Sequence, residues 1–197
     1  MKTISLFFIA ITTTCFAIIS CKKNVNQLSL LPPITDTGAN TFGCLVNGVA
    51  MLPKSGMPTW NNPYITSPVE VSFKSEIRIS IGNPDGPATS MFFYLYNLYS
   101  GGLVPFFWKQ SEFGAEAFPV YNSQLYGMLL NSNTNKYEWY GSFNNSGLTT
   151  ISKFDTVNHV IAGIFNGKLV QKNGTDTITI SNGRFDINWR TIQYKKF

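Results

Sequence analysis

Residues 69–81 read VEVSFKSEIRISI and alternate between apolar and polar side chains. The apolar positions of one parity are Val69, Val71, Phe73, Ile77, Ile79 and Ile81. Only Ser75 interrupts this series. A period of two residues is typical of a strand with one buried face and one solvated face. Because 13 residues exceed the usual length of a strand, we expect a bend or a tight turn near Lys74 and Ser75.

Strand-like segments lie on both sides of this stretch, separated by sequences rich in Asn, Gly, Ser and Pro. The expected strands are residues 42–46, 49–52, 91–99, 103–108, 125–130, 136–143, 148–154, 160–165, 168–171, 177–181 and 183–189. Asn47-Gly48 suits the two left-handed positions of a type I′ turn, which predicts a tight hairpin between the first two segments. Residues 91–99 are apolar at both parities, which predicts a strand covered on both faces. A single helical turn is expected around residues 111–113.

Short strands at regular intervals, with no helical crossover between them, indicate an antiparallel all-β domain. The connections are too short for parallel pairing. We therefore predict a single all-β domain over residues 41–197 with roughly 9–11 strands, built as a flattened meander barrel or a β-sandwich. The period does not separate these two architectures, and we favour the barrel. In the final strand, Phe185 and Ile187 are expected to face the core, and Asp186 to face outward.

The N-terminus carries a short apolar run behind one positive charge. Lys2 precedes residues 4–19, which are mostly apolar. A membrane-spanning helix needs about 20 apolar residues, so this run is short for one and is typical of a secretory signal peptide. Ile18-Ile19-Ser20-Cys21 resembles the lipobox of bacterial lipoproteins, whose signal peptide is cut before the cysteine. The resemblance implies that residues 1–20 are removed and that the sulfur of Cys21 carries a lipid anchor. The alternative is a plain secreted protein in which this cysteine is incidental.

Residues 21–40 are predicted to form a flexible tether between the anchor and the domain. They include Lys22-Lys23 and Pro32-Pro33 and show no amphipathic period. Segments of this kind run extended and bury little, although residues 28–31 (LSLL) could pack on the domain. Surface-exported lipoproteins of Bacteroidetes tend to carry acidic residues just after the lipid cysteine. Lysines at that place therefore indicate a location on the periplasmic side of the outer membrane.

Two further motifs lie at the ends of the predicted domain. Residues 37–48 read TGANTFGCLVNG, and residues 183–186 read GRFD. The pair resembles the opening and closing motifs of a family of uncharacterised Bacteroidetes lipoproteins. The resemblance covers most of residues 37–190, with an unspecific middle part. This family has no assigned activity, so the resemblance implies a lipid-anchored place in the cell envelope and supplies no catalytic residue.

The cysteines and charges limit the chemistry of the chain. Cys15 belongs to the signal peptide and Cys21 is the predicted lipid attachment site, so Cys44 has no partner for an intrachain disulfide. A lone cysteine in an apolar stretch is typical of a small buried side chain. The formal net charge is +5, and removal of Lys2 with the signal peptide lowers it to +4. The charges are scattered, which favours solubility and speaks against nucleic acid as a partner.

The sequence offers no convincing catalytic or metal-binding pattern. His159 is the only histidine and no Gly-x-Ser-x-Gly elbow occurs, so a Ser/His/Asp triad is not indicated. One histidine and one buried cysteine do not supply a zinc site. A calcium site built from Asp155, Asn158 and turn carbonyls is a weak alternative, because no EF-hand spacing supports it. No Gly-rich phosphate loop is present. We predict no catalytic residue, no metal and no cofactor.

A carboxylate-dependent glycoside hydrolase is the least favoured alternative, because it needs two carboxylates in a common cleft. The candidate carboxylates are Glu70, Glu76, Glu112, Glu116, Glu138, Asp155, Asp176 and Asp186. Most of them lie at the polar parity of a strand or in a turn, where a solvated charge is the ordinary interpretation. Asp186, close in sequence to Arg184 and Arg190, is interpreted as structural.

Binding is better supported, because aromatic residues make up 15% of the chain. The aromatic residues that exceed the needs of a core are Trp60, Tyr64, Trp108, Tyr121, Tyr126, Tyr137, Trp139 and Tyr140. Rings with a polar edge suit sugar faces and protein contacts. We predict Trp60 and Tyr64, which lie in a loop rich in Pro and Asn, and Trp139 as ligand-binding residues.

The sequence thus predicts a lipid-anchored envelope protein with a non-catalytic binding or interaction domain. The predicted partners are the membrane, through lipidated Cys21, and a glycan, a peptide, a lipid or an envelope protein. The alternative is a structural component of the envelope that binds no small ligand.

Overall fold

The computed structural model describes residues 25–55, 67–73, 76–101, 103–114 and 121–197. The predicted lipid attachment site at Cys21 lies outside these residues. Within the described part of the chain, no helix is both long enough and apolar enough to span a membrane.

The described residues form eleven strands of one antiparallel sheet, together with three short helical turns. The strands are β1 (Thr41–Val46), β2 (Val49–Met51), β3 (Val69–Phe73), β4 (Glu76–Gly82), β5 (Ala88–Tyr96), β6 (Phe106–Phe107), β7 (Gln124–Asn131), β8 (Lys136–Gly141), β9 (Gly147–Asp155), β10 (Val160–Gln171) and β11 (Thr177–Asn188). The helical turns are η2 (Gln27–Leu30), α2 (Leu98–Gly101) and η4 (Ile192–Tyr194).

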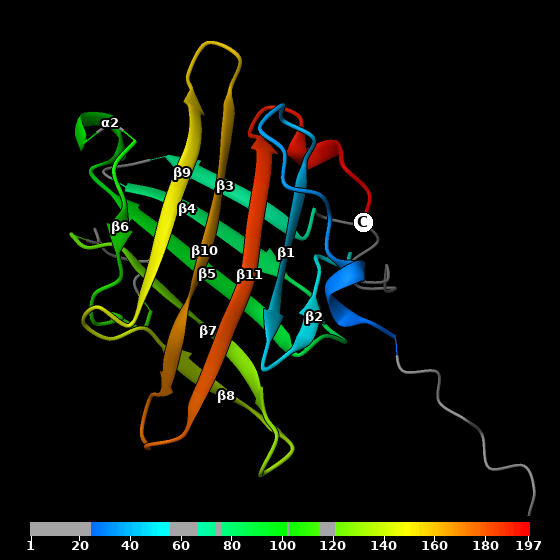
Figure 1. Ribbon diagram of the computed structural model, residues 1–197, viewed down its shortest axis with the longest axis vertical. Coiled ribbons are helices and arrows are strands. Elements are labelled where there is room, and N and C mark those ends of the chain that lie inside the picture. The colour runs from blue at the N-terminus through cyan, green and yellow to red at the C-terminus, as the bar shows by residue number, and fades with distance from the viewer. Residues whose placement is uncertain (1–24, 56–66, 74–75, 102, 115–120) are drawn as a thin grey trace, which may run out of the picture.

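The sheet runs in the order β2-β1-β11-β10-β8-β7-β5-β4-β3, and β9 and β6 branch from β10. It curls into a half-barrel of two layers (Figure 1). Strands β1, β2, β9, β10 and β11 form one layer, and β3, β4, β5, β7 and β8 form the other and cross the first obliquely. The predicted antiparallel all-β class is confirmed. Because one continuous sheet forms both layers, the fold is closer to an incomplete barrel than to a sandwich of two separate sheets.

Several local predictions are confirmed by the pairing. Asn47 and Gly48 have φ of 47° and 82° and join Val46 to its partner Val49, as a type I′ hairpin requires. Strands β3 and β4 pair antiparallel, with Val69 opposite Ile81 and Phe73 opposite Ile77. The bend expected near residues 74–75 lies outside the described residues. Residues 91–95 of β5 are covered on both faces, by the main core on one side and by an aromatic cluster on the other, whereas β5 ends at the exposed Tyr96 and residues 98–101 of the expected strand form α2.

Two predictions about local structure are wrong. The four short strands expected over residues 160–189 are two strands of 12 residues each, β10 and β11. The Asn-Gly pairs at 166–167 and 182–183 look like turns in the sequence, but they lie at an irregularity where the register shifts and Asn182 has φ of 52°. Such a bulge absorbs left-handed residues and bends the strand without ending it. The helical turn expected at residues 111–113 is absent from that segment, and a four-residue helix forms at α2 instead.

The main core lies between the two layers and is centred on phenylalanine rings. Phe93 of β5 contacts Phe165 of β10 edge to face, with ring centroids 4.4 Å apart. Phe42 of β1 stacks on Phe165 at 5.7 Å, and Phe185 of β11 lies 6.3 Å from it. Burial of each such ring stabilises the fold by about 1.5–3 kcal/mol, and the offset geometries add to this. The rings come from both layers, so this cluster holds the two layers of the half-barrel together.

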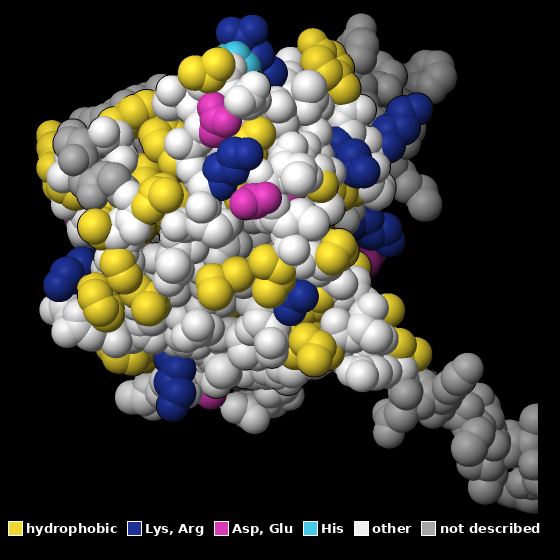
Figure 2. Space-filling model, turned by 45° about the horizontal axis from the view of Figure 1, so that its top comes forward, with side chains coloured by type: hydrophobic (Ala, Val, Ile, Leu, Met, Phe, Trp, Pro, Cys, Tyr) yellow, Lys and Arg dark blue, Asp and Glu magenta, His cyan; other side chains and the backbone are white. Residues whose placement is uncertain are grey.

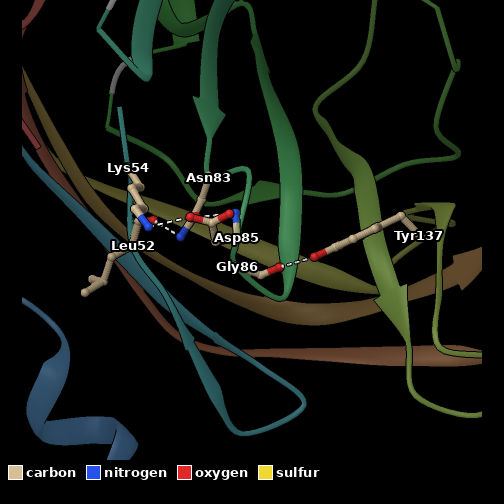
Figure 3. A network of polar contacts seen from close by, with 6 residues as sticks. All are labelled: Leu52, Lys54, Asn83, Asp85, Gly86 and Tyr137. Atoms are coloured by element: carbon tan, nitrogen blue, oxygen red, sulfur yellow. Dashed lines mark hydrogen bonds and ion pairs between the residues drawn. The ribbon is translucent and has the colours of Figure 1, made fainter. Parts of the chain in front are cut away.

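Polar contacts surround the turn between β4 and β5, where the segment that follows β2 meets it (Figure 3). Lys54 forms an ion pair with Asp85 in the turn between β4 and β5. The backbone N–H of Lys54 donates to Gly82 O at 3.1 Å. The Asn83 side chain donates from Nδ2 to Leu52 O at 2.7 Å. From β8, the Tyr137 hydroxyl donates to Gly86 O at 2.9 Å. The first three contacts join the segment after β2 to the end of β4 and the turn that follows it, and the fourth joins β8 to the same turn.

Residues 25–40, which we call the strap, are held on the domain by Asp186 of β11. This carboxylate is only 1% exposed. It accepts hydrogen bonds from Thr35 Oγ1 at 2.7 Å and from the backbone N–H groups of Thr37, Gly38 and Ala39 at 3.0, 2.7 and 3.1 Å. Consecutive N–H groups that converge in this way form an anion-binding concavity. Burial by itself would raise the pKa of Asp186, but these hydrogen bonds together outweigh it and hold the pKa below its ordinary value.

Further contacts hold the strap along its length. Gln27 Oε1 accepts from the Ala50 backbone N–H at 2.9 Å, and Arg184 Nη1 donates to Pro32 O at 3.1 Å. The strap passes so close to β1 that a Cβ on Gly43 would lie 2.8 Å from Pro32 Cδ. Hydrogen bonds thus hold residues 25–40 of the expected tether on the domain, although Leu31 is the one buried residue among them, as expected of a segment that buries little. Asp186 has the outward parity that we expected, but the strap covers it.

We expect Asp186→Asn to lower the free energy of unfolding by about 3 kcal/mol at neutral pH, because it removes the charge that several donors share and turns an amide N–H toward them. Asp36→Asn, an exposed change within the strap, should leave stability unchanged. Urea unfolding measures both.

The same pair of variants tests the pH dependence. Because the folded pKa of Asp186 is depressed, its contribution is complete above the unfolded pKa of about 3.9 and is lost as pH falls through the folded pKa. The gap in stability between wild type and Asp186→Asn should therefore narrow in acid. A gap that is constant down to about pH 2 would contradict this account.

Candidate functional site

Two of the three predicted ligand-binding residues, Trp60 and Tyr64, lie outside the described residues. Their role stays a prediction. Ser67, the first described residue after them, lines two cavities of about 570 and 530 Å³ beside β3.

Trp139 lies on the outer face of β8 in a second cluster of packed rings, which we call the outer aromatic cluster. Its members are Phe92, Tyr94, Phe113, Tyr126 and Trp139. The Trp139 ring centroid lies 6.0 Å from that of Tyr126 and 6.3 Å from that of Phe113. Trp139 is half-buried, so most of its ring serves as packing and only part of it faces solvent. Its neighbour Tyr140 points to the inner face and is fully buried.

The structure brings together two carboxylates that the sequence did not pair, Glu138 and Asp176, around Tyr140. The Tyr140 hydroxyl donates to Asp176 Oδ2 at 2.7 Å. Glu138 Oε2 accepts from Asn131 Nδ2 and Gln171 Nε2, both at 2.7 Å. Burial of Tyr140, followed by the hydrogen bond and charge of Asp176 and the charge of Glu138, raises the pKa of Tyr140. Tyr140 therefore stays a hydrogen-bond donor, and the arrangement serves as a polar clasp between β8 and the β10–β11 hairpin.

The other reactive candidates have structural surroundings. Asp155 Oδ1 accepts from the backbone N–H groups of Val157 and Asn158 at 3.0 and 2.9 Å, which forms the turn between β9 and β10. His159 follows in that turn with φ of 63°, and its ring packs 5.5 Å from Trp189. Within the described ranges, no group of three His, Cys, Asp or Glu side chains is placed to hold a metal ion.

Surface cavities provide a better candidate, a hollow that we call the aromatic groove. Its volume is about 390 Å³. Its lining residues are Tyr96, Asn97, Val104, Pro105, Phe106, Phe107, Lys109, Tyr121, Asn122, Ser123 and Asn145. The groove lies where the end of β5, the segment around β6 and the start of β7 meet. Figure 1 places β6 and α2 at the left side of the molecule, and hydrophobic side chains gather on that side in Figure 2.

Three aromatic rings of the groove are open to solvent. Tyr96, Phe107 and Tyr121 are 36%, 56% and 68% exposed. Tyr121 meets Tyr96 edge to face, with ring centroids 6.1 Å apart. Exposed rings concentrated around one hollow mark a binding surface more strongly than rings scattered singly.

Amides and one lysine supply the polar part of the lining. Asn97 and Asn145 have φ of 63° and 58°, so Asn is suited to these turns for conformational reasons as well. Asn122 Nδ2 donates to Glu112 Oε1 at 3.1 Å, while its buried Oδ1 has no hydrogen-bond partner among the described residues. An unpaired buried acceptor costs about 1–3 kcal/mol, so this oxygen is available to a water molecule or to a donor on a ligand. Lys109 adds an exposed positive charge.

Buried Trp108 holds the β6 side of the groove in place. Its Nε1–H donates to Thr149 Oγ1 at 2.9 Å, and its backbone N–H donates to Gly147 O at 2.9 Å. The ring lies against two glycines on adjacent strands, Gly147 of β9 and Gly167 of β10. A Cβ on Gly167 would lie 2.5 Å from Trp108 Cζ3 and 2.5 Å from Gly147 Cα. Gly147 and Gly167, which we call the glycine seat, leave room for the Trp108 ring. The fixed ring in turn holds its neighbours Phe107 and Lys109 in place.

The sequence singled out Tyr121 as a surplus aromatic but did not join it to Phe107, Asn97 or Asn145. These residues come from four segments that are adjacent only after the sheet has formed. Trp108, Tyr126 and Tyr140, also interpreted as surplus, are fully buried and belong to the packed interior.

Comparison with protein-family models, with curated proteins and with solved structures found no match for this chain.

We expect Gly167→Ala to destabilise the protein by about 2 kcal/mol, because the added methyl group must displace the Trp108 ring or the β9 backbone. Gly82→Ala is the matched control, since its Cβ would meet only ordinary contacts at 3.8 and 3.9 Å. Urea unfolding compares the two variants. Equal stability of both would show that the glycine seat is not needed.

Cys44 is buried in the main core, and burial raises its pKa from 9.0 to about 12. The thiolate is the reactive form, so we expect Cys44 in the folded protein to resist maleimide at neutral pH and to react after unfolding in urea. Mass spectrometry of the labelled protein measures this. Rapid labelling without denaturant would contradict the buried position.

Proposed function

We propose that this protein is a lipid-anchored protein of the cell envelope, held through Cys21, whose β domain binds a carbohydrate in the aromatic groove without catalysis. The lipobox-like Ile18-Ile19-Ser20-Cys21 and the resemblance to Bacteroidetes lipoproteins support the anchor. Lys22-Lys23 supports the periplasmic side of the outer membrane. Protease treatment of intact cells tests this orientation, because digestion of the domain would place it on the cell surface.

The observation that carries the binding proposal is the combination of three exposed rings with amide side chains around one hollow. The C–H faces of a sugar ring pack on aromatic rings, and its hydroxyl groups both donate and accept hydrogen bonds. Amides of Asn97, Asn122 and Asn145 offer donors and acceptors in the same way. Tyr rings also lose little conformational freedom on binding.

The size and polarity of the groove agree with this ligand class. A volume of about 390 Å³ lies within the usual range of small-molecule sites. Among the described residues that line the groove, the charged side chain is Lys109 and the rest are aromatic, aliphatic, amide or hydroxyl groups. Hydrolysis of a glycoside requires two carboxylates that flank the bond, which this lining does not offer. The groove therefore supports binding over cleavage.

We expect Tyr121→Ala to weaken oligosaccharide binding by about tenfold or more, because it removes the most exposed ring of the groove. Tyr194→Ala removes an exposed tyrosine outside the groove and should bind as wild type does. A glycan array of envelope and host oligosaccharides identifies the ligand, and calorimetric titration compares the variants. The protein used is the Cys21→Ser form secreted without lipid, which keeps the whole strap.

Two outcomes would contradict the proposal in different ways. If no oligosaccharide binds wild type, the carbohydrate assignment fails and the structural role in the envelope gains support. If a ligand binds equally well to Tyr121→Ala and Tyr194→Ala, the protein binds carbohydrate at another site, and the predicted residues Trp60 and Tyr64 become the next to test.

A further inference from the structure

The strap leaves little free chain between the domain and the predicted lipid. Residues 25–40 are described on the domain and are held by Asp186, Arg184 and Ala50. Three residues separate Cys21 from Val25, so the two Cα atoms lie at most about 14 Å apart. A free tether of about twenty residues could reach about 70 Å. If Cys21 carries the lipid, the face of the domain around Val25 must lie close to the bilayer surface.

That face exposes apolar side chains along the first part of the strap, before Asp36. Residues 25–34 read VNQLSLLPPI and contain no charged side chain. Exposed apolar side chains on this face are Val25, Leu28, Leu30 and Ile34 on the strap and Val49 on β2, which lies beside η2, and their exposed fractions run from 45% to 64%. In Figure 2 hydrophobic side chains gather next to the place where the described chain begins. Apolar side chains at this density suit the boundary between headgroups and acyl chains.

Positive charges flank the apolar face. Lys195 lines a cleft of about 270 Å³ together with Leu30, Pro32 and Phe197. Lys196 follows it and is exposed. In the sequence, Lys22 and Lys23 come directly after Cys21. Lysines at the rim of an apolar surface attract anionic headgroups.

We propose that the strap seats the domain directly on the phospholipid bilayer that holds the acyl chains of Cys21, with η2 against the headgroups. This inference rests on the lipid anchor of the proposed function. Several acyl chains already give durable attachment, so the strap contributes orientation more than affinity. In Figure 1 η2 and β6 lie at opposite sides of the molecule, so a seated domain presents the aromatic groove away from the membrane.

The test uses the full chain, purified with its lipid and placed in vesicles of phosphatidylethanolamine and phosphatidylglycerol. A fluorophore is attached through Leu28→Cys, or through Val157→Cys at the tip of the β9–β10 hairpin, where Val157 is 82% exposed. Buried Cys44 does not compete for the label, and the sulfur of a lipidated Cys21 is blocked. With nitroxide-labelled lipid in the vesicles, we expect the label at 28 to lose most of its fluorescence and the label at 157 to keep it.

A second variant separates the apolar face from simple nearness to the anchor. Val25→Ser combined with Leu30→Ser changes exposed side chains and should leave the fold intact, which circular dichroism checks. Quenching at 28 should fall severalfold in this variant. Unchanged quenching would overturn the role of the apolar face.

Mass spectrometry of the Cys21 peptide tells this inference apart from the function on which it rests. If Cys21 is acylated but the labels at 28 and 157 are quenched equally, the seating on the bilayer is overturned while the lipid anchor stands. If Cys21 carries no acyl group, the anchor and the seating are both overturned.

Discussion

Strand β10 pairs with β11 along one edge, and along the other it pairs first with β9 and then with β8. A backbone edge can hydrogen-bond only one strand at a time, so β9 must leave the sheet where β8 enters it. That exchange lets one sheet fold over itself and brings Phe93 of the far layer against Phe165 of β10. The core, the glycine seat of Trp108 and the groove beside β6 all depend on this arrangement.

The hydrogen bonds of Asp186 connect the N-terminal strap to β11, the last strand of the chain. A buried carboxylate is tolerated only when donors surround it, and here the strap supplies them across 147 to 151 residues of sequence. The same carboxylate therefore stabilises the fold and fixes the strap. If Cys21 carries the proposed lipid, a strap fixed to β11 and β2 determines which face of the domain can lie nearest to it.

The groove and the strap expose different kinds of apolar side chain. Exposed rings at Tyr96, Phe107 and Tyr121 are accompanied by amides, which give hydrogen bonds with direction. The exposed apolar side chains of the strap, at residues 25, 28, 30 and 34, are aliphatic and not aromatic, which suits a fluid lipid surface better than a shaped ligand. The half-barrel separates the two surfaces in space (Figure 1).

The sequence by itself determined the antiparallel β class, the Asn47-Gly48 hairpin and the β3–β4 hairpin, because side-chain period and turn chemistry act between near neighbours. It did not show that Asn166-Gly167 and Asn182-Gly183 are bulges, since the same dipeptide suits a turn or a bulge and only the partner strand decides. The burial of Asp186 and the assembly of the groove were likewise decided by tertiary structure. Each joins residues far apart in the chain, and a local pattern carries no information about the partner that folding brings.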